Sequence, residues 1–386
     1  METASIFHHL PSGGGIRVAS EMLGAMARYY RWSVHCPRGS PDPGLGLPGG
    51  LVEYPFPQSE RISGMRRLAA PLSLIRRLLA FRRVCREAAG RMSESSRRAL
   101  VHNSMVVAAP PVLEYLSIPS LYYCFEYPRH IYEPGLIRRT ANPAARALLL
   151  PLRLLEKRID RSAALSASGV ATLSRYMAGR LREIYGLEAA VVRPGVDAGR
   201  LTPGDGSAGD YVLSVGALWP FKGHELAMEA VARLPRRIRP PLRIVADREL
   251  PGYSGRLRRE AARLGVDLRV HLGIPEEDLL EAYRRARAVL CCQAREPYGL
   301  VPLEAMACAR PVVAVAEGGF SDNVDHGRTG LLAQRRPEDV ARHLESVLAD
   351  PALARRLGDA GRSFVLEDRT VEGGAERLSS LLAAIG

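Results

Sequence analysis

Two glutamates eight positions apart, Glu296 and Glu304, are the residues of this chain best suited to chemistry. Between them, Gly299 allows a close approach of the backbone, and Pro302 fits the first turn of a helix, where its missing N–H costs nothing. Glu304 is therefore expected about one turn inside a helix. The N-terminus of such a helix can bind a diphosphate through its unpaired N–H groups and partial positive charge. The two carboxylates could then hold a sugar and a ribose. The alternative for either one is a glutamate that only complements the charge of a helix N-terminus.

Three further segments follow the pair: residues 309–314, 317–319 and 326–332, the last reading HGRTGLL. With them, the stretch resembles the retaining GT4-type glycosyltransferases (glycosyl transferases group 1). The resemblance extends over nearly the whole chain, with fewer matching residues outside this stretch. It implies an α/β protein of the GT-B fold, with two Rossmann-like domains facing each other across a donor cleft. It also implies an enzyme that moves a sugar from a nucleotide-diphosphate donor to a hydroxyl acceptor.

The resemblance assigns roles to individual residues. Glu296 would hold the hydroxyls of the donor sugar, Glu304 would hold the ribose, and Lys222 would stabilise the departing diphosphate together with the N–H groups of Gly299 and Leu300. Glu296 and Lys222 are thus the expected catalytic residues. The full set of expected donor-binding residues is Glu304, Gly299, Leu300, Tyr298, Gly14, Gly15, Gly216 and Ile274. Transfer would retain the anomeric configuration and use no metal or other cofactor.

Two positions depart from the family pattern. The family often has an arginine where Ala217 stands, so half of the cationic clamp is missing or comes from elsewhere. Some members have a histidine that reaches the donor sugar where this chain has Phe125. Four residues in the first half of the chain are therefore candidates for the acceptor side: Glu126, Arg129, His130 and His102. Each could instead be a structural polar residue.

The composition excludes several classes of protein. The chain has 386 residues, 47% of them hydrophobic and 25% charged, which is typical of a globular protein of about two domains. The net charge of +13 would attract nucleotides or an anionic membrane surface, but no nucleic-acid-binding motif accompanies it. The six cysteines lack metal-ligand spacing and are expected to be reduced and buried. With no visible signal peptide or membrane span, a cytoplasmic protein is expected.

A basic stretch at residues 61–86 carries eight arginines among apolar residues at helical spacing. Pro71 is expected to divide it into two helices. This surface is compatible with peripheral contact at the inner face of an anionic membrane. The alternative is a helix that packs on the sheet and turns its arginines to water.

Short apolar runs alternate with helical patterns along both halves, which predicts two parallel sheets covered by helices. Strands are expected at residues 5–8, 32–36, 99–102, 120–124, 169–173, 211–216, 242–246, 268–272 and 288–292. Helices are expected at residues 16–29, 61–92, 174–185 (with Ser174 as N-cap), 225–234, 253–264, 276–285, 337–349, 351–358 and 372–385. A polar linker near residues 203–210 divides a first domain, 1–203, from a second, 204–367. Residues 368–386 are expected to return to the first domain.

The sequence leaves the substrates and two alternative functions open, one of which is a GT-B enzyme of another reaction class, such as a phosphorylase or a sugar epimerase. The acceptor could be an envelope lipid, a polysaccharide or a small natural product, and neither the sugar nor the base is specified. The other alternative function is that of a catalytically idle GT-B protein that binds a nucleotide sugar or a partner without transfer, since Phe125 and Ala217 depart from the family.

Overall fold

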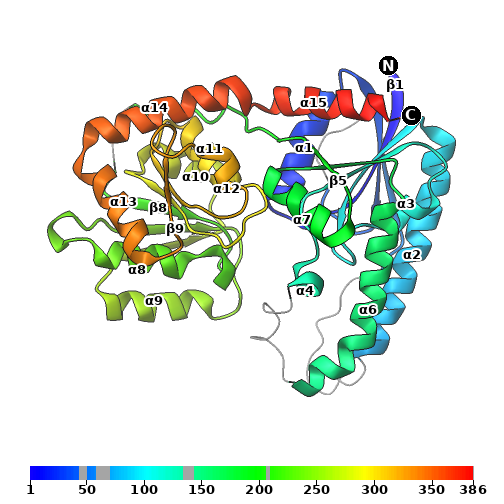
Figure 1. Ribbon diagram of the computed structural model, residues 1–386, viewed down its shortest axis with the longest axis horizontal. Helices are drawn as coiled ribbons and strands as arrows, with labels where there is room; N and C mark the ends of the chain where they lie inside the picture. Colours follow the sequence, from blue (N-terminus) through cyan, green and yellow to red (C-terminus); the bar gives the residue numbers. More distant parts are fainter. Residues whose placement is uncertain (43–49, 58–69, 134–142, 206–208, 386) are drawn as a thin grey trace. The chain divides into compact units, whose positions relative to one another are not determined.

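A computed structural model describes residues 1–42, 50–57, 70–133, 143–205 and 209–385 (Figure 1). The chain divides into two compact units. Unit 1 comprises Met1–Arg193 and Gly374–Gly386, and unit 2 comprises Pro194–Gly373. Each unit is built on one parallel sheet with helices packed against it, so the expected α/β fold class is confirmed.

The sheet of unit 1 has the strand order β3-β2-β1-β4-β5-β6-β7, and every pairing is parallel. Its strands are β1 (Glu2–His9), β2 (Tyr30–Pro37), β3 (Leu51–Tyr54), β4 (Arg98–Ser104), β5 (Ser120–Cys124), β6 (Gly169–Thr172) and β7 (Ala190–Val191). The order reverses between β1 and β4. In an open parallel sheet, the carboxyl ends of the strands at such a reversal commonly form a ligand site.

Seven helices of unit 1 are described: α1 (Gly14–Met26), α2 (Ala70–Ser95), α3 (Val112–Tyr115), α4 (Arg129–Tyr132), α6 (Pro143–Leu165), α7 (Arg175–Tyr185) and α15 (Val371–Ala384), the last of which begins in unit 2. The long helices α2 and α6 lie side by side (Figure 1). One face of the sheet packs on α2, α3, α6 and α7, where Phe7, Phe81 and Tyr122 belong to a buried core. Helix α15 packs on the same unit, because Tyr30 donates to the carbonyl of Ser379 and Arg98 to that of Leu382.

The sheet of unit 2 has the order β10-β9-β8-β11-β12-β13. Its strands are β8 (Val212–Val215), β9 (Leu242–Ala246), β10 (Leu268–Leu272), β11 (Val289–Cys291), β12 (Val312–Val315) and β13 (Leu331–Ala333). The helices are α8 (His224–Arg233), α9 (Tyr253–Leu264), α10 (Glu276–Arg285), α11 (Leu300–Ala307), α12 (Phe320–Asn323), α13 (Pro337–Ala349) and α14 (Pro351–Asp368), with short 3-10 turns η2 (Pro220–Lys222) and η3 (Arg236–Ile238). The order reverses between β8 and β11, which pair through Val289 and Leu213.

Many expected elements are present with the bounds predicted from sequence, namely β5, β9, β10, α9, α10 and α13. The side chain of Ser174 accepts from the backbone N–H of Met177, which confirms it as the N-cap of α7. The sequence missed the strands β3, β7, β12 and β13. It also missed the helix α6, because Pro151 stands inside that helix. Helix α14 is ten residues longer than expected. Pro71 lies in the first turn of α2 and does not divide the described helix, and the earlier part of the basic stretch, residues 61–69, lies outside the described residues.

The division between the units falls ten residues before the boundary predicted at 203. The reason is that residues after Arg193 pair with the end of α14. Val196 forms a bridge with Thr370 and donates its N–H to the carbonyl of Arg369. A side chain on Gly195 would overlap the backbone of Thr370, which makes this contact very close. From Gly374 onward the chain belongs to unit 1.

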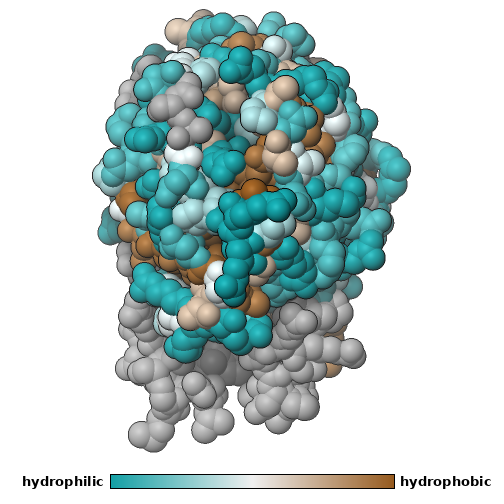
Figure 2. Space-filling model, turned by 90° about the vertical axis from the view of Figure 1, so that its left-hand side faces the viewer, coloured by the Kyte–Doolittle hydropathy of each residue, from teal (hydrophilic) through white to brown (hydrophobic). Residues whose placement is uncertain are grey.

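The state of the cysteines and the polarity of the surface agree with what the composition predicts. All six cysteines are free and buried. Figure 2, seen from the side of α13 and α14, shows a mainly hydrophilic face with apolar residues interrupted by polar ones. Within the described ranges, no helix is both long and apolar enough to cross a membrane.

Candidate active site

The strand ends at the reversal of unit 2 carry the predicted catalytic residues. Strand β8 leads through Gly216 into η2, which ends at Lys222, and β11 leads into the loop that contains Glu296. Because β8 and β11 are neighbours in the sheet, their carboxyl ends bring two segments 74 residues apart into contact. This is the position at which an open parallel sheet offers a ligand site.

Lys222 is held by a turn that packs directly on β11. Gly223 follows it with φ +75°, and a β-carbon there would overlap the carbonyl oxygen of Cys292, so only glycine fits. The N–H of Ala294 donates to the carbonyl of Phe221 at 2.8 Å. His224, fully buried, bonds to Ser214 and to the carbonyls of Gly216 and Ala217. These contacts fix the backbone of residues 216–224.

The Lys222 ammonium forms an ion pair with Glu296, with Nζ 3.0 Å from Oε2. The two side chains are 24% and 23% exposed, so the pair is partly shielded from water. The backbone of Glu296 is fixed, because its carbonyl accepts from the N–H of Gly319 at 2.7 Å. The structure therefore brings together the two residues that the resemblance assigned to the catalytic step.

Glu304 lies in the first turns of α11, as expected, but it is almost fully buried, with 3% of its surface exposed. The hydroxyl of Tyr283 on α10 donates to its Oε2 at 2.5 Å. This hydrogen bond holds the carboxylate in one orientation. Sequence reasoning missed Tyr283, because the contact depends on the packing of α10 against α11.

The N-terminus of α11 is shaped by Gly299, which has φ +90°. A β-carbon on Gly299 would lie 2.5 Å from the ring of Phe320, so the aromatic ring packs directly on the glycine. Leu300 follows, half-buried, as the first residue of the helix. The unpaired N–H groups at this end point away from the helix and suit an anion.

Two other expected donor-binding residues have different surroundings. Tyr298 is buried, and its hydroxyl donates to the carbonyl of Pro194, while its own carbonyl accepts from Asn323 at 2.9 Å. The described contacts of its side chain are thus structural. Ile274 is half-buried in the turn after β10, where Gly273 donates to the carbonyl of Ala246.

Two polar residues near Lys222 were not singled out from the sequence. Gln293 is 2% exposed, and its amide donates to the carbonyl of Val215, whereas its Oε1 has no partner among the described residues. Arg335 donates to the carbonyl of Cys292 at 2.6 Å. Ala217, where the family often has arginine, is buried with 8% exposed. The guanidinium of Arg335 is thus a second cationic group, besides the ammonium of Lys222, at the end of β11.

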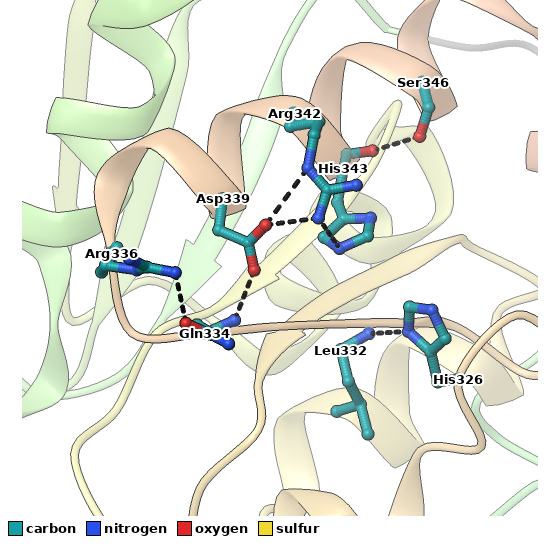
Figure 3. Close-up of polar contacts among 8 residues, drawn as sticks. All are labelled: His326, Leu332, Gln334, Arg336, Asp339, Arg342, His343 and Ser346. Carbon is teal, nitrogen blue, oxygen red and sulfur yellow. Dashed lines mark hydrogen bonds and ion pairs between the residues drawn. The ribbon is translucent and has the colours of Figure 1, made fainter.

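The loop that carries Arg335 is fixed by the start of α13 (Figure 3). Asp339 accepts from the backbone N–H of Gln334 at 2.7 Å and from Arg342, whose guanidinium lowers the pKa of the Asp339 carboxyl. On the preceding segment, His326 accepts from the N–H of Leu332 at 3.0 Å, and its ring packs edge-on against His343. These contacts position the segment that enters α13.

In unit 1, Gly14 and Gly15 form the first turn of α1, after Gly13, beside the end of β1. A β-carbon on Gly15 would lie 3.5 Å from the ring of Phe125, so this helix start packs on the residue that replaces the family histidine. His102, at the end of β4, lies against Phe125 with ring centroids 4.6 Å apart. Burial lowers the pKa of His102 to about 3, so its imidazole is neutral at physiological pH.

His8 is a further candidate that sequence reasoning missed. It lies near the end of β1, beside His102 on β4, and it is 1% exposed. Neither of its ring nitrogens has a partner among the described residues, nor does Nδ1 of His102. Burial lowers the pKa of His8 to about 4. Buried polar atoms without partners are rare in folded proteins, so these nitrogens are candidates for contact with a hydroxyl or a water.

The other acceptor-side candidates lie close to one another or to a carboxylate. Arg129, at the start of α4, lies 2.7 Å from the carboxylate of Glu126. His130 lies 3.6 Å from Glu156 on α6. Both pairs follow the end of β5, so the structure places them on the same unit as His102. Among the described residues, no group of three or more His, Cys, Asp or Glu could hold a metal ion.

Comparison with known proteins shows which family unit 2 resembles. Residues 206–364, nearly all of unit 2, match the family described as "Glycosyl transferases group 1". Unit 2 of this chain is therefore similar to this family. A D-inositol 3-phosphate glycosyltransferase of Streptomyces bingchenggensis is 36% identical over 193 residues, covering 44% of this chain and 42% of the relative. A GDP-mannose-dependent alpha-(1-6)-phosphatidylinositol monomannoside mannosyltransferase of Mycolicibacterium smegmatis is 33% identical over 240 residues, covering 56% and 62%. The chain thus spans about half the length of the curated relatives it matches.

Solved structures share the fold of this chain over nearly its whole length. Sucrose-phosphate synthase from Thermosynechococcus elongatus superposes with a TM-score of 0.76 at 19% identity, covering 99% of this chain and 98% of that one. HepE from Anabaena in complex with UDP superposes with a TM-score of 0.73 at 18% identity, covering 100% of both chains. The predicted GT-B fold is confirmed.

Proposed function

We propose that this chain is a retaining glycosyltransferase that moves a sugar from a nucleotide-diphosphate donor to a hydroxyl acceptor without a catalytic metal. The observation that carries the proposal is the meeting of Lys222, Glu296 and the N-terminus of α11 at the strand reversal of unit 2, one helical turn from the buried Glu304. A cation and a helix N-terminus suit a diphosphate, and the two carboxylates suit the hydroxyls on either side of it.

In the proposed reaction, the bond between the anomeric carbon and the diphosphate oxygen breaks, and a bond to the acceptor oxygen forms on the same face of the sugar. The acceptor hydroxyl gives its proton to the departing diphosphate. Negative charge grows on the leaving oxygen, where Lys222 and the N–H groups of Gly299 and Leu300 stabilise it. Glu296 accepts from hydroxyls of the sugar, and Glu304, oriented by Tyr283, accepts from the ribose.

We propose a polyol as the acceptor. Two relatives have names that refer to inositol compounds, and one name specifies GDP-mannose. Several solved neighbours were obtained with UDP or UDP-glucose. These names leave the base open between uracil and guanine for this chain, so both belong in the first experiment.

We also propose that unit 1 contacts an anionic membrane surface through α2 and α6. Leu79 on α2 is 61% exposed, and Leu154 on α6 is 59% exposed. Exposed basic residues flank them on the same helices, namely Arg76, Arg83 and Arg86 on α2, and Lys157 and Arg158 on α6. Exposed leucines among basic residues are typical of a surface that inserts shallowly between anionic lipid headgroups. A membrane contact of this kind suits a lipid-linked acceptor.

The proposal is tested by incubating the chain with UDP-glucose or GDP-mannose and D-inositol 3-phosphate. The expected result is release of the nucleoside diphosphate together with a glycosylated product whose NMR spectrum shows the anomeric configuration of the donor. An inverted linkage would contradict the retaining assignment. Binding of a nucleotide without any transfer, over a panel of polyol and sugar acceptors, would favour the idle binding protein. Lys222→Ala, which removes the proposed phosphate-binding ammonium, should lose transfer. Arg258→Ala, which removes one positive charge from an exposed position on α9, is the control and should keep it.

A further inference from the structure

In unit 2, the predicted sugar-binding residue, Glu296, and the predicted phosphate-binding residue, Lys222, form an ion pair with each other. The Nζ atom of Lys222 lies 3.0 Å from Oε2 of Glu296. Lys222 has no other ion pair among the described residues, and the same holds for the Glu296 carboxylate. A phosphate that draws the Lys222 ammonium away from Glu296 therefore leaves that carboxylate without its ion-pair partner.

The backbone on both sides of the pair is fixed, so only the side chains can respond. Gly223 packs on the carbonyl of Cys292, and the carbonyl of Glu296 is held by the N–H of Gly319. The Lys222 stem lies beside Gly216, where a β-carbon would come within 3.6 Å of it. Rotation of the lysine or glutamate side chain is enough to separate the charges. Separation thus costs electrostatic energy and no refolding of the loops.

The intact donor and the bare nucleoside diphosphate differ in whether they offset the electrostatic cost of separating Lys222 from Glu296. An intact nucleotide-diphosphate sugar brings hydroxyl groups, which can donate to the carboxylate of Glu296 once Lys222 turns to the phosphate. A bare nucleoside diphosphate brings no such hydroxyls, and its terminal phosphate carries more negative charge. It would leave Glu296 partly buried, unpaired and close to a like charge, which is unfavourable.

We propose that the Lys222–Glu296 ion pair makes the site discriminate against the bare nucleoside diphosphate and in favour of the intact donor. The inference rests on the proposed function and adds a determinant of specificity to it. The nucleoside diphosphate released by the reaction therefore binds more weakly than its contacts with Lys222 alone would predict. Glu296 then has two roles: it accepts from the donor sugar, and it repels the product.

The test compares the affinity of UDP with that of UDP-glucose, and of GDP with that of GDP-mannose, by calorimetry on the full chain. In Glu296→Gln, which keeps the shape and removes the charge, the bare diphosphate should bind roughly 3- to 10-fold tighter than it binds to the wild type, because an ion pair of this exposure is worth on the order of one hydrogen bond. The sugar nucleotide should bind equally well or more weakly. The ratio of the two dissociation constants is the readout.

Glu367→Gln is the matched control, because it removes one negative charge from an exposed position on α14 in the same unit. It should leave both affinities unchanged. Equal or weaker binding of the bare diphosphate to Glu296→Gln would overturn the inference, as would an equal gain for both nucleotides or the same gain in the control. If the wild type binds neither nucleotide class, the proposed donor site itself is wrong, and the inference falls with it.

Discussion

The hydroxyl of Tyr283 donates a 2.5 Å hydrogen bond to Oε2 of Glu304, and both residues are almost fully buried. A carboxylate in such surroundings needs hydrogen-bond donors, since its charge is otherwise unfavourable away from water. Tyr283 supplies one donor and sets the direction of the remaining lone pairs. The pair thus links the packing of α10 against α11 to the proposed nucleotide site.

Loss of the Glu304 carboxylate should weaken nucleotide binding strongly. Glu304→Ala removes charge-assisted hydrogen bonds to the ribose and should raise the dissociation constant of UDP or GDP about 10- to 100-fold. Tyr283→Phe keeps the carboxylate and should cost only about 2- to 5-fold. Calorimetry measures both. Tyr211→Phe, at another buried tyrosine of unit 2 that donates to a carbonyl, should leave the affinity unchanged. Equal binding by Glu304→Ala and wild type would exclude the ribose role.

A side chain at Gly299 should destabilise unit 2. Gly299→Ala places a β-carbon 2.5 Å from the Phe320 ring at φ +90°, and the two effects should together lower the free energy of unfolding by about 2 to 4 kcal/mol. Urea unfolding followed by circular dichroism measures the change. Gly179→Ala, inside α7 with open space around it, should instead stabilise unit 1 by about 0.5 to 1 kcal/mol. An unchanged transition in Gly299→Ala would show that the ring moves aside at no cost.

The stability of unit 1 should depend on pH through Asp160. This carboxylate is fully buried, and burial raises its pKa from 3.8 to about 6, although Ala109 and Tyr185 donate to it. Between pH 4 and 6 the folded state therefore holds a proton that the unfolded state has released. The free energy of unfolding should thus fall by about 3 kcal/mol as the pH rises through this window, and then level off.

Asp160→Asn should remove that slope, because the amide does not titrate. Urea unfolding at pH 4.0 to 7.0, followed by the fluorescence of the buried Trp32, measures it. Asp278→Asn, at an exposed position on α10, should keep the slope. A slope that persists in Asp160→Asn would mean that another group sets the pH dependence.

Removal of the exposed leucines of unit 1 should weaken membrane binding strongly. The wild type should float with vesicles that contain phosphatidylglycerol at low salt and separate from them at high salt. The double variant Leu79→Ser and Leu154→Ser should reduce the bound fraction about 10-fold, since each leucine contributes apolar surface to insertion. Leu366→Ser, at an equally apolar exposed site on α14 of unit 2, is the control and should float like the wild type. Wild-type protein that stays unbound at low salt would contradict the membrane proposal.

The sequence by itself determined the fold class, most element positions and the short motif from Glu296 to Glu304. Apolar periodicity, glycines and proline act over a few residues, so strands such as β9 and helices such as α10 could be placed from local pattern. The position of Glu304 within a helix followed from Pro302 in the same way.

Only the tertiary structure decided which of these residues meet. The ion pair of Lys222 with Glu296 requires that β8 lie beside β11, and local sequence does not encode that strand order. Likewise, only the folded chain brings the hydroxyl of Tyr298 to the carbonyl of Pro194. The residues after Arg193 belong to unit 2, because contacts between distant segments outweigh the polar composition of the predicted linker. Partners of a polar side chain depend on packing across the sheet, whereas its secondary structure depends on its neighbours in the chain.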